Sequence, residues 1–145
     1  MADAQLFWED VQEGQEIPPF AQKVGYMELN RFAGANNELV PFHMDPDYAK
    51  NVAKLPDVIV MGNLKLAYIA NALTGWAGDD AWIQKLFVEY RKMDVVNKTI
   101  SAKARVTKKY EQDGKHFVDL EVWVENEDGE VTTPGRATLR LPSRS

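Results

Sequence analysis

The sequence predicts an α+β fold in which an antiparallel sheet wraps around one long buried helix. The segment from Asn63 to Thr74 is apolar on nearly every side, broken only by Lys65 and Asn71, and a helix of this kind is buried. The second half of the chain alternates apolar and polar residues with period two, as strands with one buried face do. A chain of 145 residues is long enough for one such domain, which we expect to span residues 1–145.

The first half of the chain predicts short elements. Residues 16–26 contain a proline pair and are expected to form an edge strand, because proline is tolerated at sheet edges. Residues 27–35 place apolar side chains at helical spacing and predict a short helix. Asp45 and Pro46 suit the N-cap and first position of a second helix, which is expected to reach about Lys54.

The second half predicts the helix and the sheet that covers it. The central helix is expected to begin with Asn63 as its cap and to end at Gly75. Alternating stretches follow at 86–91, 100–107, 118–125 and 136–141. Asp-Gly pairs at 113–114 and 128–129 are typical of hairpin turns between long strands. We therefore expect an antiparallel meander whose apolar face packs on the helix.

Composition narrows the classes of function. The formal net charge is −5, which argues against nucleic acid or an anionic membrane as the main partner. The chain has no cysteine, so it has no disulfide, thiol nucleophile or cysteine-bound metal. The amino-terminal segment lacks the pattern of a signal peptide, and no apolar run reaches the roughly 20 residues that span a bilayer. A cytoplasmic location is the expectation.

Two ionisable residues flank a short loop and form the candidate catalytic pair. Glu38 precedes an otherwise apolar run, and His43 follows it, just before the helix start at Asp45. Charges seldom stand beside such runs without a partner or a function. Loops held by rigid elements are common positions for catalytic residues.

This segment resembles the hydratase motif of the MaoC-like dehydratases, the (R)-specific enoyl-CoA hydratases of the hot-dog fold. The family pattern is an acidic residue, any residue, Asn, Pro, any residue, His, and an acidic residue two positions later. Pro41, His43 and Asp45 match it. Glu38 stands where the family has Asp, and Val40 stands where it has Asn.

The resemblance extends over nearly the whole chain. Residues 7–11 look like the opening of these proteins, and residues 32–34 look like the segment before the motif. Residues 58–62 look like the run into the central helix, with Met61 where the family often has His. The layout of residues 43–141 is similar to MaoC-like subunits of steroid side-chain hydratases, which tend to work as heteromers.

The resemblance implies a reaction and roles for single residues. The activity would be hydration of trans-2-enoyl-CoA to (R)-3-hydroxyacyl-CoA, or the reverse dehydration, on an acyl group that can be bulky. His43 would polarise water, Glu38 would be its acid/base partner, and the N–H of Gly62 would bind the thioester oxygen. Apart from the coenzyme A thioester substrate, the resemblance implies no cofactor. The implied substrate-binding residues are Val40, Pro41, Met61 and Asn63.

Two further features bear on metals and partners. Asp45 and Asp47 follow His43 at alternate positions, but both suit a helix N-terminus better than a metal site, so no metal is expected. Trp123 stands on the polar face of its predicted strand. It is either a single exposed aromatic residue or one that a partner subunit covers. The resemblance implies a homodimer, or a heteromer with a second hot-dog subunit.

Three functions remain open at this point. The first is the enoyl-CoA hydratase. The second is a non-catalytic hot-dog subunit that shapes the acyl site of a partner, which the departures at Glu38 and Val40 favour. The third is an acyl-CoA thioesterase, in which a carboxylate such as Glu38 would activate water toward the carbonyl. The presence of His43 favours the first function over the third.

Overall fold

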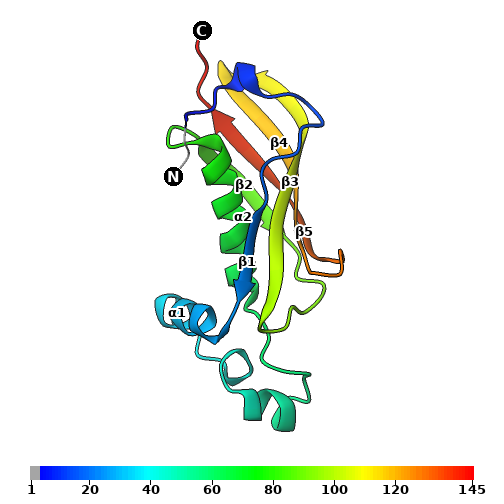
Figure 1. The fold of residues 1–145 in the computed structure, drawn as a ribbon. Helices are drawn as coiled ribbons and strands as arrows, with labels where there is room; N and C mark the ends of the chain where they lie inside the picture. Colours follow the sequence, from blue (N-terminus) through cyan, green and yellow to red (C-terminus); the bar gives the residue numbers. More distant parts are fainter. Residues whose placement is uncertain (1–3) are drawn as a thin grey trace.

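A five-stranded antiparallel sheet curls around one central helix in the computed structural model, which describes residues 4–145 (Figure 1). The central helix is α2, Gly62–Ala77. The strands are β1 (Phe20–Val24), β2 (Trp82–Val88), β3 (Lys98–Gln112), β4 (Lys115–Glu125) and β5 (Val131–Leu141). The predicted α+β arrangement is therefore confirmed. None of the helices within residues 4–145 has the length and apolar character needed to cross a membrane.

Helix α2 forms the centre of the core. Its buried side chains include Tyr68, Ile69 and Leu73, and the inward faces of β3, β4 and β5 supply most of the other buried apolar groups. The helix is longer than predicted at both ends. Gly75 does not end it, because burial of the apolar faces outweighs the cost of about 1 kcal/mol for a helical glycine. The chain leaves the helix at Gly78, where φ is +87°.

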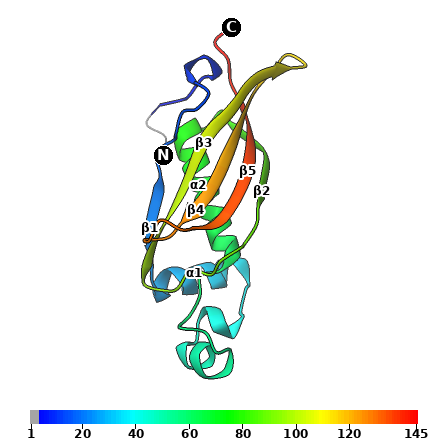
Figure 2. The ribbon, with the colours of Figure 1, turned by 90° about the vertical axis from the view of Figure 1, so that its right-hand side faces the viewer.

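The sheet has the order β1-β3-β4-β5-β2, so the predicted simple meander is wrong in one respect. Strands β3, β4 and β5 do follow one another, and their hairpin turns lie at the predicted Asp-Gly pairs. At the first turn both Asp113 and Gly114 have positive φ, as two-residue hairpin turns require. Strand β2, however, pairs with β5 at the far edge (Figure 2). Trp82 to Val88 form this strand, earlier in the chain than predicted.

The short elements of the first half agree broadly with prediction. Helix α1, Tyr26–Asn36, follows edge strand β1. The second predicted helix is a short turn of π-helix, Tyr48–Val52. Residues 46 and 47 are already helical before this turn, and Asp45 caps them, because its Oδ1 accepts the N–H of Asp47 at 2.9 Å and of Tyr48 at 3.2 Å. This segment projects beyond the end of the sheet, below α1 in Figure 1.

A short antiparallel pairing brings the chain back from this projection to α2. The N–H of Val60 donates to the carbonyl of Asp94 at 2.8 Å, and the N–H of Val96 donates to the carbonyl of Val58 at 2.9 Å. Ile59 forms a bridge with Val95 between them. The residues that precede α2 are therefore fixed to the connection between β2 and β3.

Candidate functional site

The backbone at the end of α1 positions Glu38. Asn37 ends the helix in the left-handed region, with φ of +51°, a conformation that asparagine tolerates well at this position. The N–H of Glu38 then donates to the carbonyl of Ala33 at 3.1 Å. The side-chain amide of Asn36 donates to Glu38 Oε2 at 3.0 Å. These contacts fix one carboxylate oxygen and leave Oε1 free to face the next turn.

That turn, a short 3-10 segment from Pro41 to His43, brings the two predicted catalytic side chains together. His43 Nε2 lies 3.8 Å from Glu38 Oε1. This separation is too long for a direct hydrogen bond, and it allows one water molecule to contact both atoms. The imidazole is buried, with 7% of its residue surface exposed.

A carbonyl group determines which nitrogen of His43 carries the proton. Nδ1 lies 2.8 Å from the carbonyl oxygen of Ile59. Since a carbonyl oxygen can only accept, Nδ1 must be the donor. In the neutral ring Nε2 then has a free lone pair. The nitrogen that can accept a proton is therefore the one that faces Glu38.

Gly62 lies at the same groove as His43. The groove has a volume of about 200 Å³, and its lining also includes Ile59, Val60 and Lys65. Gly62 is the first residue of α2, so its N–H has no carbonyl partner within the helix. The positive end of the helix dipole adds to this N–H, and both favour negative charge at this position. The structure thus brings the predicted base and the predicted oxyanion donor to one groove.

Tyr90 is a groove residue that sequence reasoning missed as part of the site. Its ring lies against Gly62, and its hydroxyl donates to Asn63 Oδ1 at 3.3 Å. Burial of the ring and, secondarily, the negative charge of Glu38 raise the pKa of the Tyr90 hydroxyl. Tyr90 was expected in a strand, but β2 ends at Val88. In the sequence, Tyr90 only continues an alternating apolar pattern, which indicates a strand and not a functional site.

The predicted substrate-binding residues have different positions. Asn63 is exposed and accepts a hydrogen bond from Tyr90 at the edge of the groove. Val40 is half-buried and Pro41 is exposed, and neither lines the groove. Met61 is fully buried in the core. Its side chain packs inside the protein because it immediately precedes the buried helix, so it does not face the groove in this chain.

A buried ion pair lies beside the groove, and one of its members, Lys65, lines it. Lys65 Nζ is 3.0 Å from Asp94 Oδ2, and the two side chains are only 3% and 1% exposed. The sequence showed Lys65 only as a break in an apolar helix surface. Its partner is distant in sequence and lies in a connection, so no periodic pattern could indicate the pair.

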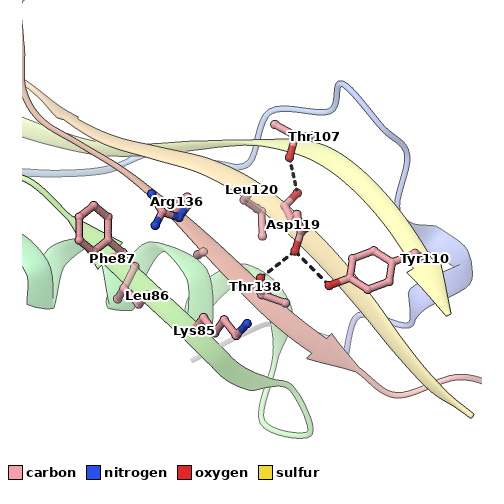
Figure 3. Close-up of a pocket in the computed structure, with 10 residues that line it drawn as sticks. Lys85, Leu86, Phe87, Thr107, Tyr110, Asp119, Leu120, Arg136 and Thr138 are labelled. Atoms are coloured by element: carbon pink, nitrogen blue, oxygen red, sulfur yellow. Dashed lines mark hydrogen bonds between the residues drawn. The ribbon is translucent and has the colours of Figure 1, made fainter. Parts of the chain in front are cut away.

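A larger hollow of about 470 Å³ lies on the outer face of the sheet, away from this groove (Figure 3). Asp119 lies at its centre and accepts hydrogen bonds from Thr138 at 2.7 Å and from Tyr110 at 3.3 Å. Arg136 lies over the ring of Phe87, 4.5 Å from the ring centroid. The carboxylate is thus already paired with neutral donors, and no histidine lines the hollow.

The residues considered for a metal have other partners. Asp45 accepts the N–H groups of Asp47 and Tyr48, and Asp47 Oδ1 accepts a hydrogen bond from Asn51 at 2.6 Å. Across residues 4–145, no three side chains of His, Cys, Asp or Glu are grouped so that they could hold a metal ion.

Solved structures share this fold. The unliganded R-hydratase PhaJ1 from Pseudomonas aeruginosa superposes with a TM-score of 0.87 at 18% identity, covering 97% of this chain and 88% of that one. The (R)-hydratase from A. caviae involved in PHA biosynthesis gives 0.84 at 21% identity, with coverages of 92% and 99%. The ChsH1–ChsH2 complex from Mycobacterium tuberculosis gives 0.78 at 18% identity, with coverages of 90% and 98%. The shared architecture is the hot-dog fold.

Comparison at the level of sequence identifies the family. A search of curated proteins gave no match. The family model described as the MaoC like domain matches residues 13–128, which is most of the chain and includes Glu38, His43 and Gly62. The resemblance drawn from the motif is confirmed: the chain belongs to the MaoC-like dehydratase domain family.

Proposed function

We propose that this protein hydrates trans-2-enoyl-CoA thioesters to (R)-3-hydroxyacyl-CoA, or catalyses the reverse dehydration. The observation that carries the proposal is the state of His43. Its Nδ1–H is held by the carbonyl of Ile59 at 2.8 Å, and its Nε2 lies 3.8 Å from Glu38. A neutral imidazole fixed in this way is suited to accept a proton from water.

In the first step, a water molecule between His43 Nε2 and Glu38 Oε1 attacks the β-carbon of the enoyl group. The water oxygen forms the new carbon–oxygen bond, and His43 takes one water proton. The electron pair of the carbon–carbon double bond moves toward the thioester carbonyl. The negative charge develops on that oxygen, which the N–H of Gly62 and the dipole of α2 stabilise.

In the second step, the enolate collapses and its α-carbon takes a proton from the pair of His43 and Glu38. The net change is addition of H and OH across the double bond, so the pair returns to its starting state. Glu38 has one methylene more than the family's aspartate. Asn36 holds the other carboxylate oxygen at 3.0 Å, and the distance of 3.8 Å between Glu38 Oε1 and His43 Nε2 is short enough for one water to reach both atoms despite this extra length.

The test is the loss of enoyl conjugation. Purified protein would be incubated with trans-2-enoyl-CoAs of short, medium and steroid-sized acyl groups, and the ultraviolet absorbance of the conjugated thioester followed. We expect absorbance to fall with formation of the (R)-3-hydroxyacyl product, and the rates to give the acyl preference. His43→Ala and Glu38→Gln should abolish the reaction. His116→Ala is a matched control, because His116 contacts Trp8 and Glu111, and should leave the rate unchanged.

A non-catalytic or partner-dependent subunit is the second candidate function. It is favoured by Glu38 and Val40, which depart from the family motif, and by the similarity to one of the hot-dog chains of a two-protein complex. No hydration of any substrate by the folded protein would support this candidate. Release of free coenzyme A without a hydroxyacyl product would instead indicate a thioesterase.

We also propose that the protein assembles as a homodimer or as a heteromer with a second hot-dog subunit. Strand β2 is one edge of the sheet, and Trp82 and Phe87 on it are 63% and 45% exposed. Large exposed apolar groups on an edge strand favour pairing with another chain. Sedimentation of the purified protein, alone and with a candidate partner, would measure the assembly.

A further inference from the structure

The buried pair of Lys65 and Asp94 joins the two halves of the candidate site. Lys65 lies in the first turns of α2, and Asp94 lies in the connection between β2 and β3. The carboxylate Oδ2 also accepts the hydroxyl of Thr132 at 2.7 Å, and Lys65 Nζ donates to the carbonyl of Lys92 at 3.0 Å. Burial of two charges is costly unless the geometry is good and further hydrogen bonds complete it, and both conditions hold here.

One side of the pair leads to His43. The carbonyl of Asp94 accepts the N–H of Val60 at 2.8 Å. The preceding residue, Ile59, accepts Nδ1 of His43 with its carbonyl at 2.8 Å and donates its own N–H to the carbonyl of Phe42 at 3.2 Å. The position of Asp94 therefore determines the position of the oxygen that fixes the ring and tautomer of His43.

The other side leads to Gly62. The carbonyl of Lys92, held by Lys65, lies two residues after Tyr90. Lys65 Nζ is 5.9 Å from the centroid of the Tyr90 ring, within the range of a cation–π contact. That ring lies directly against Gly62. Lys65 thus contacts the ring of Tyr90, which forms the wall of the groove next to the expected position of the thioester oxygen.

We propose that Lys65 and Asp94 are positioning residues: their buried ion pair sets His43 and the Gly62 end of α2 in register across the groove. Lys65 lines the groove, but its Nζ is engaged by Asp94 and by the carbonyl of Lys92, so we assign the pair an indirect action through Ile59 and Tyr90. An apolar pair of similar volume would fill the same space without desolvating two charges. We therefore assign the two charges a different role: their directional contacts determine how the two segments lie relative to one another. The assignment of His43 and Gly62 as reacting groups rests on the proposed function, whereas the contacts of the ion pair do not.

The test replaces both charges and observes His43 directly. Protein labelled with ¹⁵N at histidine would be studied by long-range ¹H–¹⁵N correlation spectroscopy, which distinguishes the two tautomers, with His116→Gln used to assign the signals. We expect the wild type to show only the Nδ1–H tautomer of His43. The double variant Lys65→Met/Asp94→Leu should remain folded and show a mixture of tautomers.

A matched control is Lys103→Met/Glu125→Leu, which removes an ion pair of 2.9 Å on the outer face of the sheet and should leave the His43 signals unchanged. Thr132→Val removes only the hydroxyl that supports Asp94, so it tests the same connection if the double variant does not fold. We expect a smaller change of the same kind. Wild-type signals of His43 in folded Lys65→Met/Asp94→Leu, or in Thr132→Val if the double variant does not fold, would overturn the proposal.

Activity provides a separate measurement. In a hydratase, the double variant should lower kcat about tenfold or more while KM changes less than about threefold, because misplacement of catalytic groups affects mainly the chemical step. If the wild type does not hydrate any enoyl-CoA, the proposed function is wrong, and the spectrum of His43 still decides whether the pair positions it.

Discussion

The ring of Tyr90 lies so close to Gly62 that a Cβ at this glycine would be 2.7 Å from the nearest ring carbon. No side chain fits there unless the tyrosine moves. The aromatic ring therefore covers the start of α2 on the side where a Cβ would point.

The first prediction concerns Gly62→Ala. Tyr90 is half-exposed, so its ring can move aside and the free energy of unfolding should change by less than about 1 kcal/mol. The hydration rate should nevertheless fall at least about tenfold, because the new methyl group and the displaced ring change the space for the thioester oxygen. Thermal unfolding and the enoyl-CoA assay measure the two effects.

Gly34→Ala provides the control for that variant. Gly34 lies in α1, and a Cβ added to it would meet no other group within 4 Å. Alanine should therefore keep full activity and stabilise the helix by about 0.5–1 kcal/mol. Full activity of Gly62→Ala would show that Gly62 is not required as an oxyanion donor.

The second prediction concerns the titration of Tyr90. Burial raises the pKa of its hydroxyl, and the negative charge of Glu38 raises it further, because an anion nearby disfavours the phenolate. Glu38→Gln should therefore lower the pKa of Tyr90, while burial keeps it above that of a free tyrosine. The difference between each protein and its Tyr90→Phe variant in phenolate absorbance isolates this residue. An unchanged Tyr90 pKa in Glu38→Gln would indicate that the charge of Glu38 does not act on Tyr90.

The third prediction compares single and double changes of the buried pair. Lys65→Met leaves the carboxylate of Asp94 buried without its counter-charge, and should lower the free energy of unfolding by about 3–5 kcal/mol. Lys65→Met/Asp94→Leu should recover most of this loss, because no unpaired charge remains. Urea unfolding at pH 7 measures both. A double variant that is less stable than the single one would contradict the prediction.

The fourth prediction concerns Asp57. The N–H of Val58, followed by Lys50 and Tyr26, lowers the pKa of this carboxyl, against a smaller opposing effect of burial. Its charged form therefore stabilises the fold above the pKa of the unfolded state, about 3.9, and this contribution disappears as pH falls through the lower folded-state pKa. Asp57→Asn should be less stable than wild type at pH 7, and the difference should shrink toward pH 3. A difference that does not depend on pH would refute this account.

The fold and the close approach of the candidate pair could be predicted from the sequence, because both depend on local patterns. Alternation located β3, β4 and β5, and the motif located Glu38 and His43. The edge position of β2 did not follow, because sheet order depends on how the chain crosses the core and leaves no periodic trace. The extension of α2 past Gly75 reflects tertiary burial that outweighs local propensity.

The supporting residues could not be found in the same way. Lys65 interrupts an apolar surface, which indicates a buried partner but not which one. Asp94 is one of 22 acidic residues, and only the folded connection brings it to Lys65. Tyr90 continues the alternating pattern of the sequence, although strand β2 ends before it at Val88. Met61 was assigned to the site by analogy, whereas its side chain packs inward.

The projecting segment between His43 and Ile59 has a consequence for how such a protein can diversify. Its two ends are tied together by the paired contacts of Ile59 with Phe42 and His43, so it is a closed loop attached beside the groove. The entropic cost of closing a loop grows only slowly with its length. Insertions or deletions within residues 45–57 can therefore accumulate without displacing His43, so the surroundings of the groove can change while the pair of Glu38 and His43 keeps its geometry.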